Sequence, residues 1–336
     1  MKNDTQYTFN QIIGSSEKFK AVIEEAKILA RNEGEVLIVG ETGTGKELFV
    51  QSIHNASTRC DKQFVSLNCS AIPENLMETM LFGSCKGAYT GAVNQRGLLE
   101  EAEGGTLFLD EINSMSLAMQ AKLLRLLETK RFRKVGSSKE QSCNIRFISA
   151  MNEDPKVAIA ANQLRLDIYY RIGMFVLFIP PLRERKKDIR CLASYFARTT
   201  AAACGKRAIQ LSDKTMKMFM NYPWPGNVRE LKHVITQCVY LAHDDDLYLM
   251  PHHLRSNEII NSYQPSNTLY QETCIADETN LNINLKAYEK ILIKEALEKN
   301  DNNISKTAKY LHITRQSLHG KINKYNLAEK NERIEV

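Results

Sequence analysis

The chain has 336 residues, of which 43% are hydrophobic, and its 45 Lys and Arg against 39 Asp and Glu give a formal net charge of +6. This length predicts two or three folded units, and the apolar fraction is ordinary for a globular protein. No apolar run reaches the roughly 18 residues of a membrane span. The eight cysteines are scattered and include no C-x-x-C pair, which argues against a disulfide framework or a metal cluster and favours the reducing cytosol.

The first segment with helical spacing of apolar residues is 14–31. Few residues precede it, so we expect residues 1–8 to be a short extension and the chain to lack a sensory domain of its own. Control would then come from a separate partner, from the expression level, or from a domain that has been lost.

An apolar run, Val36–Val39, leads directly into a glycine-rich stretch that begins a helix. The run suits a strand buried on both faces, and the pattern G-x-x-x-x-G-K after a strand is typical of a loop that cradles phosphates with its backbone N–H groups. A flexible glycine turn is the alternative. The preceding strand, the glycine spacing, Lys46 and the following helix together favour a binding site for a nucleotide triphosphate. The residues expected to contact ATP are Gly40, Glu41, Thr42, Gly43, Thr44, Gly45, Lys46 and Glu47.

Two further buried strands end in polar residues. The strand 64–67 ends at Asn68, and the strand 104–109 delivers Asp110 and Glu111. Beside a phosphate loop, the first carboxylate of such a pair holds Mg²⁺ and the second orients and deprotonates the attacking water. The alternative is a solvated strand end with no catalytic role.

The remaining pattern predicts the fold class and the order of the domains. Strands at 145–150 and 175–179 complete an α/β core, a parallel sheet covered by helices on both faces, at 9–182. Charged helices without strand-like runs fill 183–255, and the polar stretch 256–283 is typical of a linker.

The last unit, 284–326, has a short helix (304–311), a tight turn and a second helix (314–325), followed by a tail at 327–336. Nine Lys and Arg against four acids in this unit favour duplex DNA as its partner. A helical hairpin used for protein contact is the alternative. The residues expected to meet bases or phosphates are Thr314, Arg315, Gln316, Ser317, His319 and Lys321.

A further motif, G-A-Y-T-G-A, lies between the phosphate loop and the Asp110–Glu111 strand. With G-E-T-G-T-G-K-E, G-G-T-L-F-L-D-E-I, P-P-L-R-E-R and W-P-G-N-V-R-E-L in the same order, the chain resembles bacterial enhancer-binding proteins, the AAA+ ATPases that activate sigma-54 RNA polymerase. The last unit resembles their Fis-type helix-turn-helix domain. The resemblance implies that the helices at 183–255 form the AAA+ lid and that a loop touches sigma-54, with the residues Gly87, Ala88, Tyr89, Thr90, Gly91 and Ala92.

The resemblance also assigns roles to single residues. Asn68 matches the residue that holds the catalytic glutamate until the γ-phosphate arrives, and Asn152 matches sensor I. Arg165 and Arg171 match arginine fingers given to a neighbouring subunit of a ring, usually a hexamer, although from the residues alone either could be a surface ion-pair partner. Arg229 matches sensor II in the lid.

Taken together, the resemblance implies a cytoplasmic, enhancer-bound activator that hydrolyses ATP to remodel the closed complex of sigma-54 holoenzyme. The sequences of its loop and lid motifs are most similar to those of regulators of amino-acid catabolism in Gram-positive bacteria. Two rivals remain: a DNA-binding regulator that uses ATP only to assemble and works with the main sigma factor, and an AAA+ protein unfoldase. The intact Lys46, Asp110 and Glu111 disfavour the first, and the basic C-terminal helices disfavour the second.

Overall fold

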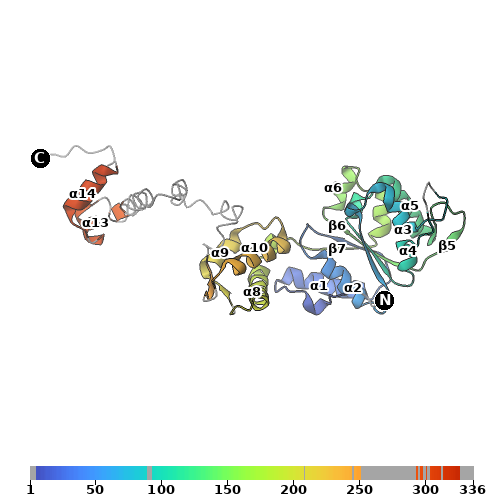
Figure 1. The fold of residues 1–336 in the computed structure, drawn as a ribbon, viewed down its shortest axis with the longest axis horizontal. Helices are drawn as coiled ribbons and strands as arrows, with labels where there is room; N and C mark the ends of the chain where they lie inside the picture. The colour runs from blue at the N-terminus through green and yellow to red at the C-terminus, as the bar shows by residue number, and fades with distance from the viewer. Residues whose placement is uncertain are drawn as a thin grey trace. The chain divides into compact units, whose positions relative to one another are not determined.

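The computed structural model of the chain divides into two compact units, Met1–Tyr263 and Gln264–Val336 (Figure 1). It describes residues 5–88, 93–207, 209–243, 246–250, 293, 296–297, 300, 303–311 and 313–325. The expected linker at 256–283 and the tail at 327–336 lie outside the described residues, as do the first four residues of the expected extension.

The first unit is built on a five-stranded sheet with the strand order β2-β3-β6-β1-β7, in which all neighbouring strands are parallel. The strands are β1 (Val36–Val39), β2 (Phe64–Asn68), β3 (Thr106–Asp110), β6 (Arg146–Met151) and β7 (Phe175–Phe178). The predicted parallel sheet and its five strands are therefore confirmed, each to within two residues at its ends.

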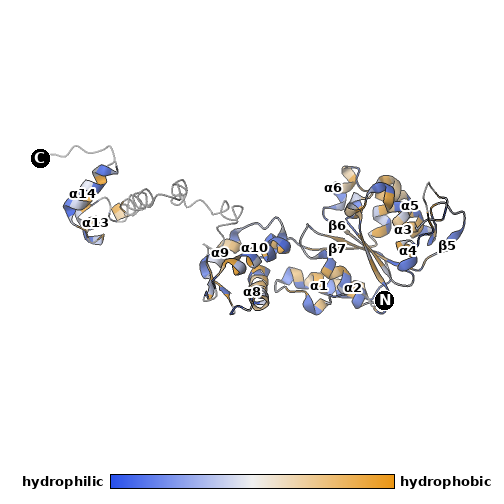
Figure 2. Ribbon diagram, viewed as in Figure 1, coloured by the Kyte–Doolittle hydropathy of each residue, from blue (hydrophilic) through white to orange (hydrophobic). Residues whose placement is uncertain are grey.

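Alternate residues of the interior strand β1 enter two different cores, because successive side chains of a strand point to opposite faces. Val36 and Ile38 pack with α1 (Glu17–Ala30) and α2 (Lys46–Asn55). Leu37 and Val39 belong to the core on the other face, which is covered by the helices α3 (Glu74–Phe82), α4 (Leu98–Glu101), α5 (Leu117–Thr129), α6 (Pro155–Ala160) and α7 (Leu166–Ile172). Both apolar and polar residues occur along α3 and α5 (Figure 2), and the buried ones recur at the three- and four-residue spacing of a helix with one buried face.

The structure contains a hairpin that the sequence did not predict, formed by the antiparallel strands β4 (Arg131–Arg133) and β5 (Glu140–Ser142). These strands are short and mostly polar, and only Phe132 among them is fully buried. Short 3₁₀ turns complete the connections: η1 (Phe9–Gln11), η2 (Cys69–Ala71), η3 (Ile112–Ser114) and η4 (Leu182–Glu184).

The rest of the first unit is a helical lid of α8 (Lys186–Ala203), α9 (Asp213–Asn221) and α10 (Asn227–Leu241). Its core surrounds Trp224, the single tryptophan of the chain, which is fully buried. The expectation of no strands in this region is wrong, because β8 (Gln210–Leu211) and β9 (Tyr248–Leu249) form a parallel pair. Two-residue strands leave no alternation pattern for a sequence to display.

The second unit contains α13 (Ile304–Tyr310) and α14 (Arg315–Lys324), as predicted to within a residue or two. The spacing of Ala308, Leu311, Ile313, Leu318 and Ile322 in the sequence predicts a small core for this unit. In the structure the core includes Ala308, Leu318 and Ile322, with Leu311 and Ile313 packed against them. The sequence of the last unit also predicts a helix at 285–298, and most of this range lies outside the described residues. No helix within the described part of the chain is long and apolar enough to cross a membrane.

Helix α1 is held at each end by a buried charged side chain. At its N-terminus, Asp188 of α8 accepts hydrogen bonds from the backbone N–H groups of Ser15 and Ser16 at 2.6 and 2.7 Å and from the hydroxyl of Ser16 at 2.9 Å. At its C-terminus, Arg146 of β6 donates to the carbonyls of Leu29 and Ala30. Anions at helix N-termini and cations at C-termini are both favourable, so this helix connects the lid to the sheet.

Replacing Asp188 with Ala is expected to lower the free energy of unfolding by about 3 kcal/mol, because three donors lose their acceptor and two of them belong to the buried Ser16. Urea denaturation measures this change. Asp61→Ala, at an exposed turn position, is the control and should change stability by less than about 0.5 kcal/mol. Equal stability of the two variants would contradict the capping role of Asp188.

Candidate functional site

The polar residues predicted to bind and split ATP follow neighbouring strands at one edge of the sheet. Asn68 and Asp110 are paired in register at the ends of β2 and β3. The backbone N–H of Gly40, directly after β1, donates to the carbonyl of Met151, and Asn152 comes next. Because ligands of open α/β sheets bind at the carboxyl ends of the strands, these residues share the expected place for a nucleotide.

The lid holds the carbonyl groups of the phosphate loop. The carbonyl of Gly43 accepts hydrogen bonds from the backbone N–H groups of Val228 and Arg229 at 3.0 and 3.3 Å. The carbonyl of Thr44 accepts from the guanidinium of Arg185, which is almost fully buried. A side chain at Gly43 has no room, since an added Cβ would lie 2.3 Å from the carbonyl oxygen of Gly226, and φ there is +80°.

Side chains also join this loop to the lid, through Asn227 and Glu41. The Asn227 amide donates to the carbonyl of Thr42 and to the Glu41 carboxylate, both at 3.1 Å, and accepts from the backbone N–H of Leu182. Arg183 binds the same carboxylate through both terminal nitrogens, and this pairing is the main reason that the pKa of Glu41 is lowered. The Glu41 side chain is therefore engaged by the lid. The expected contact of Glu41 with phosphate could be made only by its backbone.

Lys46, at the start of α2, has its ammonium group 2.6 Å from the carbonyl oxygen of Gly40. Burial lowers its pKa, and the nearby charge of Arg229 lowers it further, while Asp110 and Glu111 act in the opposite direction. Burial raises the pKa of Asp110, with Lys46 opposing the shift. The site thus brings together the predicted Lys46, Arg229 and both carboxylates, and the half-buried Asp110 is a carboxylate that a divalent cation would stabilise.

Glu111 has a left-handed backbone, with φ 52° and ψ 49°, a conformation that non-glycine residues adopt mainly where the surroundings impose it. Its predicted partner Asn68 accepts hydrogen bonds from the backbone N–H and hydroxyl of Ser70. Asn68 and Glu111 are both described, and no hydrogen bond joins them in the structure. Asn152 accepts from Asn113, which also donates to Glu153 at 2.7 Å. Asn113, two residues after Glu111, was not identified from sequence.

The two predicted arginine fingers differ in their surroundings. Arg165 is partly exposed and pairs with Asp167 through two hydrogen bonds at 3.0 and 2.7 Å. Arg171 donates to the carbonyl of Leu127 at the end of α5, and its Nε atom is buried without a partner within the described part of the protein. Arg165 is therefore the more available of the two for a neighbouring molecule.

The loop expected to contact sigma-54 follows the end of α3. Its base is closed by an antiparallel bridge between Ser84 and Gln95 and by hydrogen bonds of Gly83 and Cys85 with Val135, near the β4–β5 hairpin. The described Gly87 and Ala88 belong to this loop, while Tyr89, Thr90, Gly91 and Ala92 lie outside the described residues. Val135 was missed in the sequence, because nothing in its local pattern indicates contact with residues fifty positions earlier.

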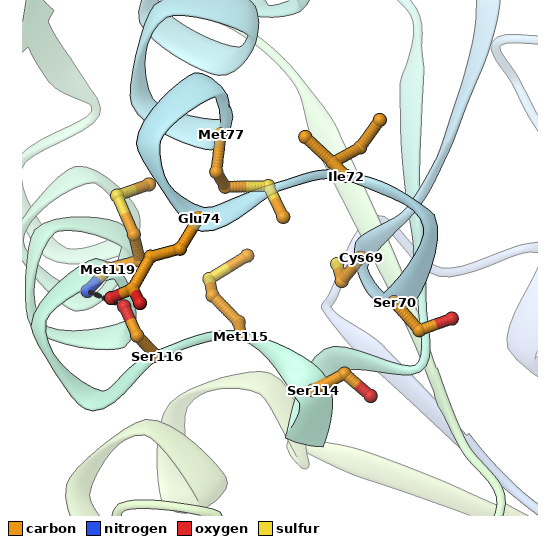
Figure 3. Close-up of a pocket in the computed structure, with 9 residues that line it drawn as sticks. All are labelled: Cys69, Ser70, Ile72, Glu74, Met77, Ser114, Met115, Ser116 and Met119. Atoms are coloured by element: carbon orange, nitrogen blue, oxygen red, sulfur yellow. Dashed lines mark hydrogen bonds between the residues drawn. The ribbon is translucent and has the colours of Figure 1, made fainter.

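A cavity of about 280 Å³ lies between the segment after Asn68 and the segment after Glu111. Figure 3 shows Met77, Met115 and Met119 around it, with Cys69 and Ser70 from the segment after Asn68 and Ser114 and Ser116 from the segment after Glu111. Methionine side chains adapt to irregular space. The strand ends themselves are paired, and only the segments that follow Asn68 and Glu111 are separated by this methionine-lined space.

In the second unit, the predicted DNA-contacting residues Thr314, Arg315, Gln316, Ser317 and His319 are exposed, and Lys321 is half-buried. The hydroxyl of Thr314 accepts from the backbone N–H of Ser317 and so caps α14. The exposed residues cluster at the N-terminal part of this helix, which is the part that helix-turn-helix proteins place against base edges.

Three known domains match the chain in sequence. Residues 12–178 match the Sigma-54 interaction domain, residues 183–268 the AAA+ ATPase lid domain, and residues 285–325 the bacterial regulatory protein, Fis family.

Whole proteins match as well. The chain is 44% identical to the transcriptional activator RocR of Bacillus subtilis, over 97% of this chain and 70% of RocR. It is 37% identical to the regulatory protein LuxO of Vibrio parahaemolyticus, over 99% of this chain and 74% of LuxO. The crystal structure of NtrX from Brucella abortus in complex with ATP superposes with a TM-score of 0.70 at 28% identity, over 94% of this chain and 70% of that one.

Replacing Asn227 with Ala is expected to weaken ATP binding about tenfold, because the phosphate loop loses its donors to Thr42 and Glu41. Titration with ATP and Mg²⁺ measures the affinity. Asn227→Gly removes the same hydrogen bonds but suits the φ of 52° at this position, so it should lose similar affinity at a smaller cost in stability. Asn221→Ala, exposed at the end of α9, is the control. Unchanged affinity in both Asn227 variants would show that the lid does not shape the loop.

Proposed function

Because the chain belongs to the sigma-54-dependent transcriptional activators, which are AAA+ ATPases with a Fis-type DNA-binding domain, we propose that it remodels the closed promoter complex of sigma-54 RNA polymerase from an upstream enhancer. The observation that carries this proposal is the convergence of Lys46, Asp110, Glu111 and Arg229 at one edge of the sheet, in a chain whose sequence also contains a G-A-x-T-G-A motif.

ATP would lie with its phosphates on the N–H groups of the phosphate loop. Lys46 carries its charge to the β- and γ-phosphates, and Arg229 adds a second charge from the lid of the same subunit. Asp110 would hold Mg²⁺, which when bound neutralises part of the phosphate charge. Glu111 then accepts a proton from the attacking water, and Asn152 helps to orient that water and the γ-phosphate.

The subunits would assemble into a ring, which we propose to be a hexamer, so that Arg165 and Arg171 act on the nucleotide of a neighbour. The exposure of the Arg165 side chain supports this role. Its pairing with Asp167 then gives way to a charge-assisted bond with the γ-phosphate. Glu111 and Arg165 of one subunit therefore serve two different active sites.

Hydrolysis would reach sigma-54 through α3. Asn68 lies one strand away from Glu111, α3 begins a few residues later, and the sigma-54 loop, Gly87–Ala92, follows its end. In this proposal, the Asn68 side chain exchanges its hydrogen bonds with Ser70 for one with Glu111. This exchange would shift α3 relative to the methionine-lined cavity, and the shift of α3 would move the sigma-54 loop. Coupling of a γ-phosphate to a mobile element in this way has precedent among nucleotide-dependent switches.

The second unit would bind enhancer DNA as a dimer on paired half-sites, with Arg315, Gln316 and His319 near the bases and Thr314, Ser317 and Lys321 near the phosphates. The protein would act in the cytoplasm, on the nucleoid. We propose genes of amino-acid catabolism as its targets, a choice that rests on the resemblance of its motifs.

Glu111→Gln should bind ATP with normal affinity yet hydrolyse it roughly 10²–10⁴-fold more slowly, because the amide cannot take the proton of the attacking water. Phosphate release at saturating ATP measures the rate. Glu101→Gln, an exposed substitution on α4, serves as the control. Hydrolysis by Glu111→Gln at a rate near that of the control would exclude Glu111 as the base.

Thr90→Ala should keep its ATPase rate but lose the ability to open a sigma-54 promoter, because Thr90 belongs to the loop and not to the nucleotide site. Open complexes on supercoiled DNA and phosphate release are measured in the same reaction. Thr199→Ala, exposed on α8, should retain both activities. Normal promoter opening by Thr90→Ala would remove the loop from the mechanism.

A further inference from the structure

Gln120 of α5 is a fully buried polar side chain whose amide is completely engaged. Its nitrogen donates to the carbonyl of Met115 at 2.8 Å and to the carbonyl of Gln163 at 2.7 Å, and its oxygen accepts from the backbone N–H of Arg165 at 2.9 Å. A buried amide with every contact satisfied fixes its partners in place, since breaking any one bond leaves a buried group unpaired.

The contacts with residues 163 and 165 resemble those of a neighbouring strand. One carbonyl and one N–H, on either side of Leu164, both face the Gln120 amide, while the Leu164 side chain is buried in the core. The backbone of Arg165 is therefore anchored, and only its side chain extends to the surface, where it pairs with Asp167.

The hydrogen bond to Met115 joins Gln120 to the segment that follows the catalytic carboxylates. Met115 follows η3, and η3 follows Glu111 directly, so this carbonyl ends the turn that begins at Glu111. One side chain thus joins the segment after Glu111 to the segment that carries Arg165.

We propose that Gln120 is a positioning residue for the arginine finger: it sets where Arg165 enters the active site of the neighbouring subunit. This proposal rests on the proposed function, in which Arg165 acts on a neighbour's ATP. Misplacement of a catalytic group by about 1 Å can cost on the order of 100-fold in rate, so loss of the Gln120 amide should slow hydrolysis by that order.

The test separates action on the neighbour from damage within the subunit. Gln120→Met keeps the size of the side chain and removes its three hydrogen bonds. Rings of this variant alone should hydrolyse ATP on the order of 100-fold more slowly than the native ring, while each subunit still binds ATP normally. When the variant is mixed with Glu111→Gln subunits, whose Arg165 is intact, hydrolysis should rise about tenfold or more, because intact fingers now reach the Gln120→Met sites.

Arg165→Ala mixed with Glu111→Gln is the matched control. If Arg165→Ala is rescued and Gln120→Met is not, Gln120 acts within its own subunit and the positioning role is wrong, while the finger role of Arg165 stands. If Arg165→Ala is not rescued, the finger role itself fails, and the role of Gln120 fails with it. Should Gln120→Met not fold, Gln120→Glu, which keeps the acceptor for Arg165 but loses both donors, is taken through the same mixture with the same two outcomes.

Discussion

The nucleotide site depends on the hydrogen bonds that hold the carbonyl groups of the phosphate loop against the lid. Thr42, Gly43 and Thr44 each give a carbonyl oxygen to a donor from the lid or from the segment that leads into it. Carbonyl and N–H groups of a peptide point in opposite directions, so carbonyls turned toward the lid favour N–H groups turned toward the phosphates. The loop and the lid therefore form one binding element, although Asn227 and Glu41 lie 186 positions apart in the chain.

This arrangement requires backbone conformations that most residues avoid. Trp224 and Asn227 in the lid and Glu111 beside the sheet all have φ of 52°. Such conformations persist where packing imposes them and are concentrated at functional sites. The packing is visible here: Trp224 is fully buried, donates its indole N–H to Phe219 and meets the rings of Phe219 and Tyr222 edge to face. The lid core thus supports the turn that presents Asn227 to the phosphate loop.

The sequence predicted the elements whose signals are local. Buried apolar runs indicated all five strands of the sheet, and the glycine spacing before Lys46 indicated the phosphate loop. It did not predict the pairing partners of single polar residues. Nothing in the local pattern around Gln120 indicates its contact with the backbone of Arg165, and Glu41 was expected to contact phosphate. Only the fold brings Gln120 to Arg165 and Glu41 to Arg183. The β4–β5 hairpin was not predicted, because a single buried residue, Phe132, does not produce the alternation of apolar and polar residues that indicates a strand.

The central claim is that energy from ATP hydrolysis, and not ATP binding alone, opens DNA for the sigma-54 enzyme. Reactivity of unpaired thymines at a sigma-54 promoter, with the upstream site present, tests it most directly when ATP is compared with a non-hydrolysable analogue. We expect reactive thymines with ATP and sigma-54 holoenzyme, and none with the analogue. Opening with the analogue, or opening by holoenzyme that carries the main sigma factor, would contradict the claim.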